Sequence, residues 1–156
     1  MAKERWLPLL LGVGWAVATA TLGAALTPLT PWYNGLERPW FQPPDWAFGP
    51  AWSLIFALSA YAFIRAWRAG ARQGLVVAYA VNGLLNGGWS LLFFTMQRPD
   101  WAMLEVIPLW LSILAMLLVA RRHDRRAAWF IAPYLAWVTF AACLNWAIIG
   151  LNGPFG

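Results

Sequence analysis

Residues 127–149 have the sequence AAWFIAPYLAWVTFAACLNWAII, in which none of the 23 side chains is charged. About 20 helical residues are enough to cross the roughly 30 Å hydrocarbon core of a bilayer. Because backbone N–H and C=O groups in lipid must hydrogen-bond within their own segment, a span of this length is expected to be a helix. This stretch therefore predicts an integral membrane protein.

Four more stretches of similar length precede it, and the fourth of them is interrupted only by Glu105. We therefore expect an all-α fold, a single membrane domain over residues 1–156 that forms a bundle of five transmembrane helices. The expected helices cover about residues 6–26, 47–67, 75–95, 101–120 and 127–149, and a long first loop covers 27–46.

The composition agrees with a membrane location. Of the 156 residues 62% are hydrophobic and 11% charged, against roughly 45–50% and 25% in ordinary soluble domains. One cysteine and one histidine leave no disulfide framework and no cluster for a structural zinc site, so no metal is expected. The net charge of +5 comes from short basic runs between uncharged stretches, which indicates membrane topology rather than nucleic-acid binding.

The distribution of Lys and Arg predicts the orientation. Nine of the 11 lie in the N-terminal segment and in the turns 65–74 and 121–126, whereas the opposite side carries only Arg38 and Arg98. By the positive-inside rule the N-terminus is cytoplasmic, in a multi-pass protein of a bacterial cell membrane. A cleaved signal peptide over residues 1–26 is an alternative, although the uncharged run exceeds the usual apolar core of about 7–15 residues.

The loop 27–46 has the sequence TPLTPWYNGLERPWFQPPDW. Its five prolines prevent a continuous helix and stiffen the chain. A long, stiff and aromatic loop is more typical of a lid or binding element than of a linker.

Small residues recur on three of the expected helices. Helices in lipid associate through close backbone approach and polar contacts, and such stripes permit both packing within the chain and a homodimer. We expect packing within the chain to be their main use. The stripes are Gly12, Ala16, Ala20 and Ala24; Gly83 and Gly87; and Ala128, Ala132 and Ala136.

Polar residues inside the spans mark candidate binding faces. Asn82 and Asn86 share one helical face with Trp89 and Phe93, and Asn145 lies in the last span. These asparagines either bond neighbouring helices or contact a ligand, and the sequence leaves both open. Glu105 either reaches the headgroups or pairs with a neighbouring helix.

The 13 tryptophans divide by their depth in the spans. Four lie at span ends, where an interfacial aromatic belt is expected: Trp6, Trp67, Trp101 and Trp129. Six others exceed what a belt requires and predict an apolar pocket with N–H donors, suited to a flat, aromatic ligand. These six are Trp32, Trp40, Trp46, Trp52, Trp89 and Trp137.

Motifs along the chain point to a known family. They are Trp32-Tyr33, Arg38-Pro39-Trp40, Gln42-Pro43-Pro44-Asp45-Trp46, Gly49-Pro50-Ala51-Trp52, Leu85-Asn86-Gly87-Gly88-Trp89 with Phe93-Phe94, Trp101-Ala102-Met103-Leu104-Glu105, and Pro133-Tyr134-Leu135-Ala136-Trp137 through Leu144-Asn145. In these the sequence resembles the TspO/MBR family of tryptophan-rich sensory proteins, related to the translocator or peripheral-type benzodiazepine receptor.

The resemblance implies a five-helix bundle, usually dimeric, with a pocket that binds porphyrins such as protoporphyrin IX. It also implies, in some members, light-dependent porphyrin degradation that needs tryptophans matching Trp52 and Trp137, which are therefore the catalytic candidates. No cofactor is required, and the porphyrin is a ligand. With the residues singled out above, the expected ligand-binding set is Trp32, Tyr33, Trp40, Trp46, Trp52, Phe56, Asn82, Asn86, Trp89, Phe93, Trp137, Ala141 and Leu144.

Three positions depart from the family pattern. Phe56 stands where many members have a tyrosine, and Leu91 replaces a frequent proline, which favours a straighter third helix. Trp146 replaces the tyrosine of the C-terminal sterol motif, so sterol binding by that motif is unsupported. The leading hypothesis is a membrane receptor or sensor for tetrapyrroles; a porphyrin-degrading enzyme and a transporter of porphyrins or other lipophilic molecules are the alternatives.

Overall fold

The computed structural model describes residues 2–155, and the side chains from residue 5 to residue 155. All regular structure in this part of the chain is helical, and five helices are long and apolar enough to cross a membrane, which confirms the expected fold class. The elements are α1 (Ala2–Ala25), α2 (Pro31–Asn34), α3 (Asp45–Arg68), α4 (Gln73–Ser90), η1 (Leu91–Thr95), α5 (Pro99–His123) and α6 (Arg125–Asn152).

The spans predicted from uncharged runs lie within the observed helices, except that the first was predicted to end at residue 26, one residue beyond the end of α1. The helices themselves continue beyond the apolar part, as α6 does to Asn152 and α5 to His123. The predicted spans ended at charged residues. A helix can continue through charged residues, so the predicted helices were too short. The short helix α2 within the loop was not predicted.

The third span ends in a π-helical segment that begins at Leu91, where a straighter helix was expected; the segment was not predicted. From Leu91 to Thr95 the backbone adopts the π form, and Met96 N donates to Leu91 O at 2.8 Å. A π turn closes its hydrogen bond five residues on instead of four. The side chains after it are therefore rotated by about one residue relative to a regular α-helix.

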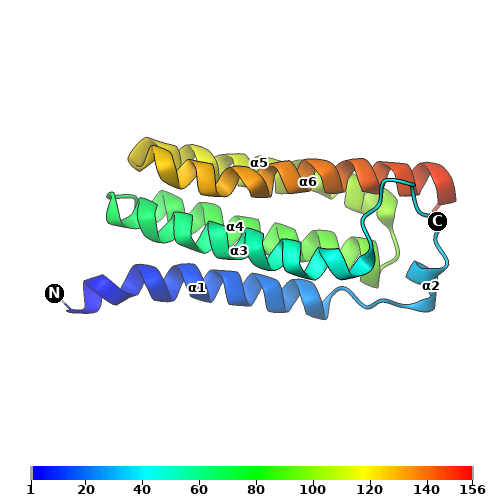
Figure 1. Ribbon diagram of the computed structural model, residues 1–156, viewed down its shortest axis with the longest axis horizontal. Helices are drawn as coiled ribbons and strands as arrows, with labels where there is room; N and C mark the ends of the chain where they lie inside the picture. Colours follow the sequence, from blue (N-terminus) through cyan, green and yellow to red (C-terminus); the bar gives the residue numbers. More distant parts are fainter. Residues whose placement is uncertain (1, 156) are drawn as a thin grey trace.

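The helices pack in an antiparallel arrangement with two different ends (Figure 1). In that view α1 lies along one side, α3 and α4 occupy the middle, and α5 and α6 lie on the other side. The N-terminus, the α3–α4 turn and the α5–α6 turn share one end, here called the basic end. The 27–44 connection and the C-terminus share the other, here called the loop end.

Glycines let α1 approach its two neighbours closely. A Cβ atom at Gly12 would lie 3.0 Å from the backbone oxygen of Ala60 in α3. One at Gly83 would lie 3.0 Å from Thr19 Oγ1, and one at Gly87 would collide with Leu22. The expected packing within the chain is confirmed for these three glycines. They therefore give no support to a homodimer, which stays a prediction.

The core lies among α3, α4, α5 and α6, and α1 adds to it from outside. Phe63, Tyr79, Ile113 and Ile131 belong to one continuous buried cluster of these four helices. Trp15 attaches α1 to this cluster, because its Nε1 donates to the Tyr79 backbone oxygen at 2.8 Å and its ring packs edge-on against Tyr79.

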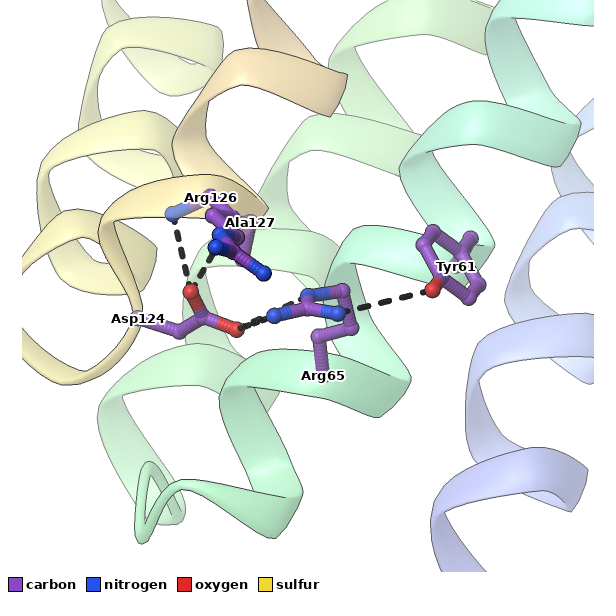
Figure 2. Close-up of polar contacts among 5 residues, drawn as sticks. All are labelled: Tyr61, Arg65, Asp124, Arg126 and Ala127. Atoms are coloured by element: carbon purple, nitrogen blue, oxygen red, sulfur yellow. Dashed lines mark hydrogen bonds and ion pairs between the residues drawn. The ribbon is translucent and has the colours of Figure 1, made fainter.

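An ion pair joins α3 to the start of α6 at the basic end (Figure 2). Arg65 Nη2 lies 2.7 Å from Asp124 Oδ2, and Asp124 Oδ1 accepts hydrogen bonds from the backbone N–H groups of Arg126 and Ala127. Partial burial raises the pKa of the Asp124 carboxyl, but these N–H groups and the Arg65 guanidinium outweigh it and hold the pKa below its usual range. Asp124 thus serves both as the N-cap of α6 and as a link between helices.

Replacing Asp124 separates these two roles. Asp124→Ala removes the cap and the charge and is expected to lower the free energy of unfolding by ~1–2 kcal/mol. Asp124→Asn keeps a capping oxygen, and its free energy of unfolding is expected to fall by less, because asparagine is an equally good N-cap. Thermal unfolding in detergent, followed by circular dichroism, measures both. Equal losses in the two variants would contradict the capping role.

The same carboxyl makes stability depend on pH. Because its folded-state pKa is lowered, its charge contributes stability at pH values above the unfolded pKa of about 4, and this is lost as the pH falls through the folded pKa. The difference in unfolding temperature between the parent and Asp124→Asn is therefore expected to shrink between pH 7 and pH 3. A difference that stays constant or grows would refute the assignment.

Candidate functional site: an aromatic cavity under the first loop

A cavity of about 530 Å³ lies in the loop-end half of the bundle. All five spans and the loop contribute to its wall, and its volume falls in the range of roughly 300–1,000 Å³ that is usual for small-molecule sites. Its described lining is Ala20, Gly23, Ala24, Thr27, Leu29, Tyr33, Asp45, Phe48, Gly49, Trp52, Ser53, Phe56, Asn86, Trp89, Ser90, Phe94, Val106, Leu109, Trp137, Val138 and Ala141.

Aromatic rings from α3 and α6 form one wall of the cavity. Trp52 stacks on Phe56 with 5.3 Å between ring centroids and meets Trp137 edge-on at 6.3 Å. Phe48 in turn packs edge-on against Trp137 at 5.8 Å. These residues share a wall because Phe48, Trp52 and Phe56 follow one another at intervals of four along α3.

A buried polar network forms the floor. Tyr134 donates its hydroxyl proton to Asn82 Oδ1 at 3.1 Å and accepts from Asn86 Nδ2 at 2.9 Å. Asn82 Nδ2 donates to Ser112 Oγ at 2.9 Å, so the network joins α4, α5 and α6. Asn86 also faces the cavity, where its Oδ1 would lie 3.8 Å from a Cβ atom placed on Gly23.

A charged cluster lies at the loop end of the cavity. Arg38 Nη1 lies 2.9 Å from Asp45 Oδ2, its guanidinium carbon lies 4.9 Å from the Tyr33 ring centroid, and Tyr33 donates to Asp45 Oδ1 at 3.3 Å. Burial, and then the negative charge of Asp45, raises the pKa of the Tyr33 hydroxyl above its usual value, so Tyr33 stays a neutral donor. The loop is also attached to α6, where the Asn152 side chain bonds both N–H and C=O of Glu37.

The cavity opens beside α1. Its exposed lining residues come from α1, from the loop and from the first turns of α3, among them Ala20, Ala24, Gly49 and Ser53. The lining residues of α4, α5 and α6 are buried or partly buried. A ligand would therefore enter past small side chains and meet the aromatic wall behind them.

Comparison with known proteins agrees with this architecture. The sequence model of the TspO/MBR family matches residues 7–151. The chain belongs to the TspO/MBR family. It is 34% identical over 156 residues to the tryptophan-rich protein TspO of Chlorobaculum tepidum, covering 96% of this chain and 99% of that one.

Two further relatives are named as a sensory protein and as a translocator protein. The tryptophan-rich sensory protein of Cereibacter sphaeroides is 37% identical over 136 residues, covering 86% of this chain and 85% of that one. The translocator protein of Sus scrofa is 31% identical over 122 residues, covering 75% of this chain and 72% of that one. The family resemblance inferred from the motifs is thus confirmed.

Seven of the 13 residues expected to bind ligand line the cavity of this TspO/MBR protein. They come from three of the five spans and from the loop, and helical spacing on a polar-marked face identified most of them. They are Tyr33, Trp52, Phe56, Asn86, Trp89, Trp137 and Ala141.

The three loop tryptophans lie outside the cavity lining, contrary to the sequence expectation. Trp40 is 94% exposed, and its neighbour Phe41 takes the inner position against Phe140. Trp46 is 76% exposed because it lies two positions before Phe48, about 200° away around α3. Trp32 packs edge-on against Phe93 and Phe155.

Three helical candidates also lie outside the lining. Phe94 lines the cavity in place of Phe93, because the π turn moves the cavity-facing position one residue along the chain. Asn82 is fully buried one turn below Asn86, with both ends of its amide engaged in the network. Leu144 is buried one turn beyond Ala141.

Several lining residues were not among the sequence candidates. Phe48 and Gly49 lie one turn before Trp52, so the helical period alone would have found them. Ala20 and Ala24 belong to the small-residue stripe that was read as a packing surface, and Gly23 lies between them. Small residues occur both where helices pack closely and where they line a cavity, so residue type alone does not distinguish the two.

Glu105 was expected either to reach the headgroups or to pair with a neighbouring helix, and the structure shows neither. Both carboxyl oxygens are buried, and neither has a hydrogen-bond partner among the described residues. A Cβ atom on Gly88 would lie 3.7 Å from Glu105 Oε1, so the carboxyl faces Gly88 of α4. It is not among the residues that line the cavity.

The floor network makes a prediction for Tyr134→Phe. This change removes the donor to Asn82 and the acceptor of Asn86 while keeping the ring, and we expect a loss of ~1–2 kcal/mol in unfolding free energy. Tyr61→Phe on α3 is the matched control, because the Tyr61 side chain is exposed and its hydroxyl only accepts a long 3.5 Å contact from Arg65. Unfolding by SDS titration in mixed micelles compares the two. Equal effects would argue against a stabilising network.

Proposed function

We propose that this TspO/MBR protein is a membrane receptor or sensor that binds a tetrapyrrole, such as protoporphyrin IX, in the aromatic cavity. The observation that carries the proposal is the 530 Å³ cavity walled by Trp52, Phe56, Trp89 and Trp137. Aromatic faces suit a flat, apolar macrocycle, which stacks or packs edge-on against them. The name of the Cereibacter sphaeroides relative, a tryptophan-rich sensory protein, supports the same class of function.

The polar groups around the wall supply orientation. Trp89 Nε1 and Trp137 Nε1 are buried and have no acceptor among the described residues, so acceptor atoms of a ligand would satisfy them. At the loop end, Tyr33 and the Arg38–Asp45 pair would contact the edge of a ligand that faces the lid. A flat ring with polar substituents on its edge matches this distribution.

Filling the cavity tests the proposal without removing any wall residue. Gly23→Leu would extend a side chain into the cavity beside Asn86, because a Cβ atom at Gly23 meets nothing nearer than 3.8 Å. We expect at least a roughly tenfold weaker affinity for protoporphyrin IX, equivalent to ~1.4 kcal/mol. Titration followed by the absorbance and fluorescence of the porphyrin measures the affinity.

Gly14→Leu is the matched control. It lies on α1, and a Cβ atom there meets nothing within 4 Å, so this leucine would face outward from the bundle. Its porphyrin affinity should equal that of the parent. Trp52→Ala, which removes part of the aromatic wall, should weaken binding as well. Unchanged affinity in both Gly23→Leu and Trp52→Ala would exclude the cavity as the binding site.

The proposed location is a bacterial cell membrane with the basic end in the cytoplasm. Nine of the 11 Lys and Arg residues belong to the three segments at the basic end, and the positive-inside rule assigns such an end to the cytoplasm. The cavity and the lid would then face the opposite side. A homodimer remains part of the proposal, but its interface would use surfaces other than Gly12, Gly83 and Gly87.

One observation favours a second candidate function, light-dependent oxidation of a bound porphyrin by dioxygen. Trp52 and Trp137 lie edge-to-face in the same wall, with 6.3 Å between ring centroids. Under light and oxygen, the parent would lose porphyrin absorbance faster than Trp52→Phe or Trp137→Phe. Trp129→Phe, which changes a tryptophan that is 72% exposed, should behave as the parent. Equal rates in all four proteins would reject this activity.

A further inference from the structure

A second, smaller hollow lies at the basic end. It shares no lining residue with the aromatic cavity. Its volume is about 440 Å³. The first turns of α1, the last turn of α3 and the following turn line it, and we call it the arginine cleft. Its described lining is Arg5, Leu7, Pro8, Trp67, Arg68 and Arg72.

The arginine cleft concentrates positive charge. Three of its six lining residues are arginines, and its described lining contains no carboxylate. Arg5 and Arg68 form no ion pair or side-chain hydrogen bond with the described residues. The nearby Asp124 is already engaged by Arg65 and by the N–H groups of α6 (Figure 2). Among the described residues, therefore, no carboxylate neutralises the charge of the cleft, which suits an anionic ligand.

One of the three guanidinium groups is held in place. Arg72 Nη1 donates to the backbone oxygens of Trp67 and Ala71, and the guanidinium carbon lies 4.8 Å from the Trp67 ring centroid. Its Nε and Nη2 remain to bond a ligand. A guanidinium fixed in this way loses little side-chain freedom on binding and presents a planar fork that fits phosphate oxygens.

The position of the arginine cleft indicates the kind of anion. It lies where the first span begins and the second span ends, and Leu7, which is 43% exposed, continues the wall towards the apolar part of α1. A group that bonds here would have its charge among the arginines and any apolar chain along α1. Basic pockets at the ends of transmembrane helices bind lipid headgroups in this manner.

From these observations we propose that the arginine cleft is a binding site for a phosphate group at the membrane surface. The phosphate of an anionic phospholipid and free phosphate share the chemistry that the arginines recognise. The apolar continuation along α1 favours the lipid. The site is independent of the aromatic cavity, and its test does not depend on porphyrin binding.

Native mass spectrometry of the full chain in non-ionic detergent tests the proposal. The probes are phosphatidylglycerol, phosphatidylcholine and inorganic phosphate, each titrated separately. The test variant is Arg5→Gln/Arg68→Gln, because neither side chain bonds another described residue. The control is Arg122→Gln/Arg125→Gln, which removes the same charge from the other turn at the same end. Thermal unfolding establishes that both variants are folded.

We expect one phosphatidylglycerol to bind the parent more tightly than phosphatidylcholine. The test variant should weaken this binding by about tenfold or more, and the control by less than about twofold. If inorganic phosphate binds equally well and with the same dependence on Arg5 and Arg68, the site stands and free phosphate is its ligand. Equal losses in test and control variants would overturn the proposal, because they indicate diffuse attraction. So would the absence of any preference for phosphatidylglycerol together with no binding of phosphate.

Discussion

The hydroxyl group of Tyr134 holds together the part of the bundle on which the cavity rests. In lipid, helices gain little from burying apolar side chains against each other, so polar cross-links and close backbone contacts decide how they associate. Tyr134 hydrogen-bonds both Asn82 and Asn86 of α4, and Asn82 donates a further hydrogen bond to Ser112 of α5. Three helices are thereby fixed at one depth, and the space above them on the loop side stays open.

Helix α1 packs closely on its neighbours in its first half and borders the aromatic cavity in its second half. In its first half, Gly12 lies against α3 and Trp15 bonds the backbone of α4. In its second half one face still packs on α4, where Leu22 fits against Gly87, while another face carries Ala20, Gly23 and Ala24 along the cavity. A larger side chain on the second face would fill the space that the floor network leaves. The same stripe of small residues thus produces contact in one half and volume in the other.

The sequence predicted the spans well because the bilayer imposes a simple rule on them. Charge marks the limits of each apolar run, and the length of the run requires a helix. The helical part of the site followed for a similar reason, since Trp52, Asn86 and Trp137 could be placed on faces by the period of the α-helix. Where that period changes, the prediction was wrong by one residue, so that Phe94 and not Phe93 meets the cavity. Nothing in the sequence LLFFT marks a π turn.

The loop could not be predicted to the same degree because it has no period. Aromatic content suggested that Trp40 and Trp46 face a ligand, yet which side of a stiff, proline-rich segment faces inward depends on where it is attached. The attachments are polar and distant in sequence, namely Asn152 to the backbone of Glu37 and Arg38 to Asp45. Trp15 was assigned neither to the aromatic belt nor to the pocket from the sequence. In the structure it hydrogen-bonds the backbone of α4 and so attaches α1 to the core.

The polar groups of the cavity lining restrict which ligands fit it. Asp45 is the one carboxylate in its described lining, and it is engaged by Arg38 and Tyr33. The buried polar atoms of the lining that have no described partner are the indole N–H donors of Trp89 and Trp137. A buried donor left unsatisfied costs ~1–3 kcal/mol, so the site gains most from a ligand that brings acceptor atoms to these two positions and an apolar plane between them. The tryptophans therefore do more than supply apolar surface, because their N–H groups restrict which flat molecules fit.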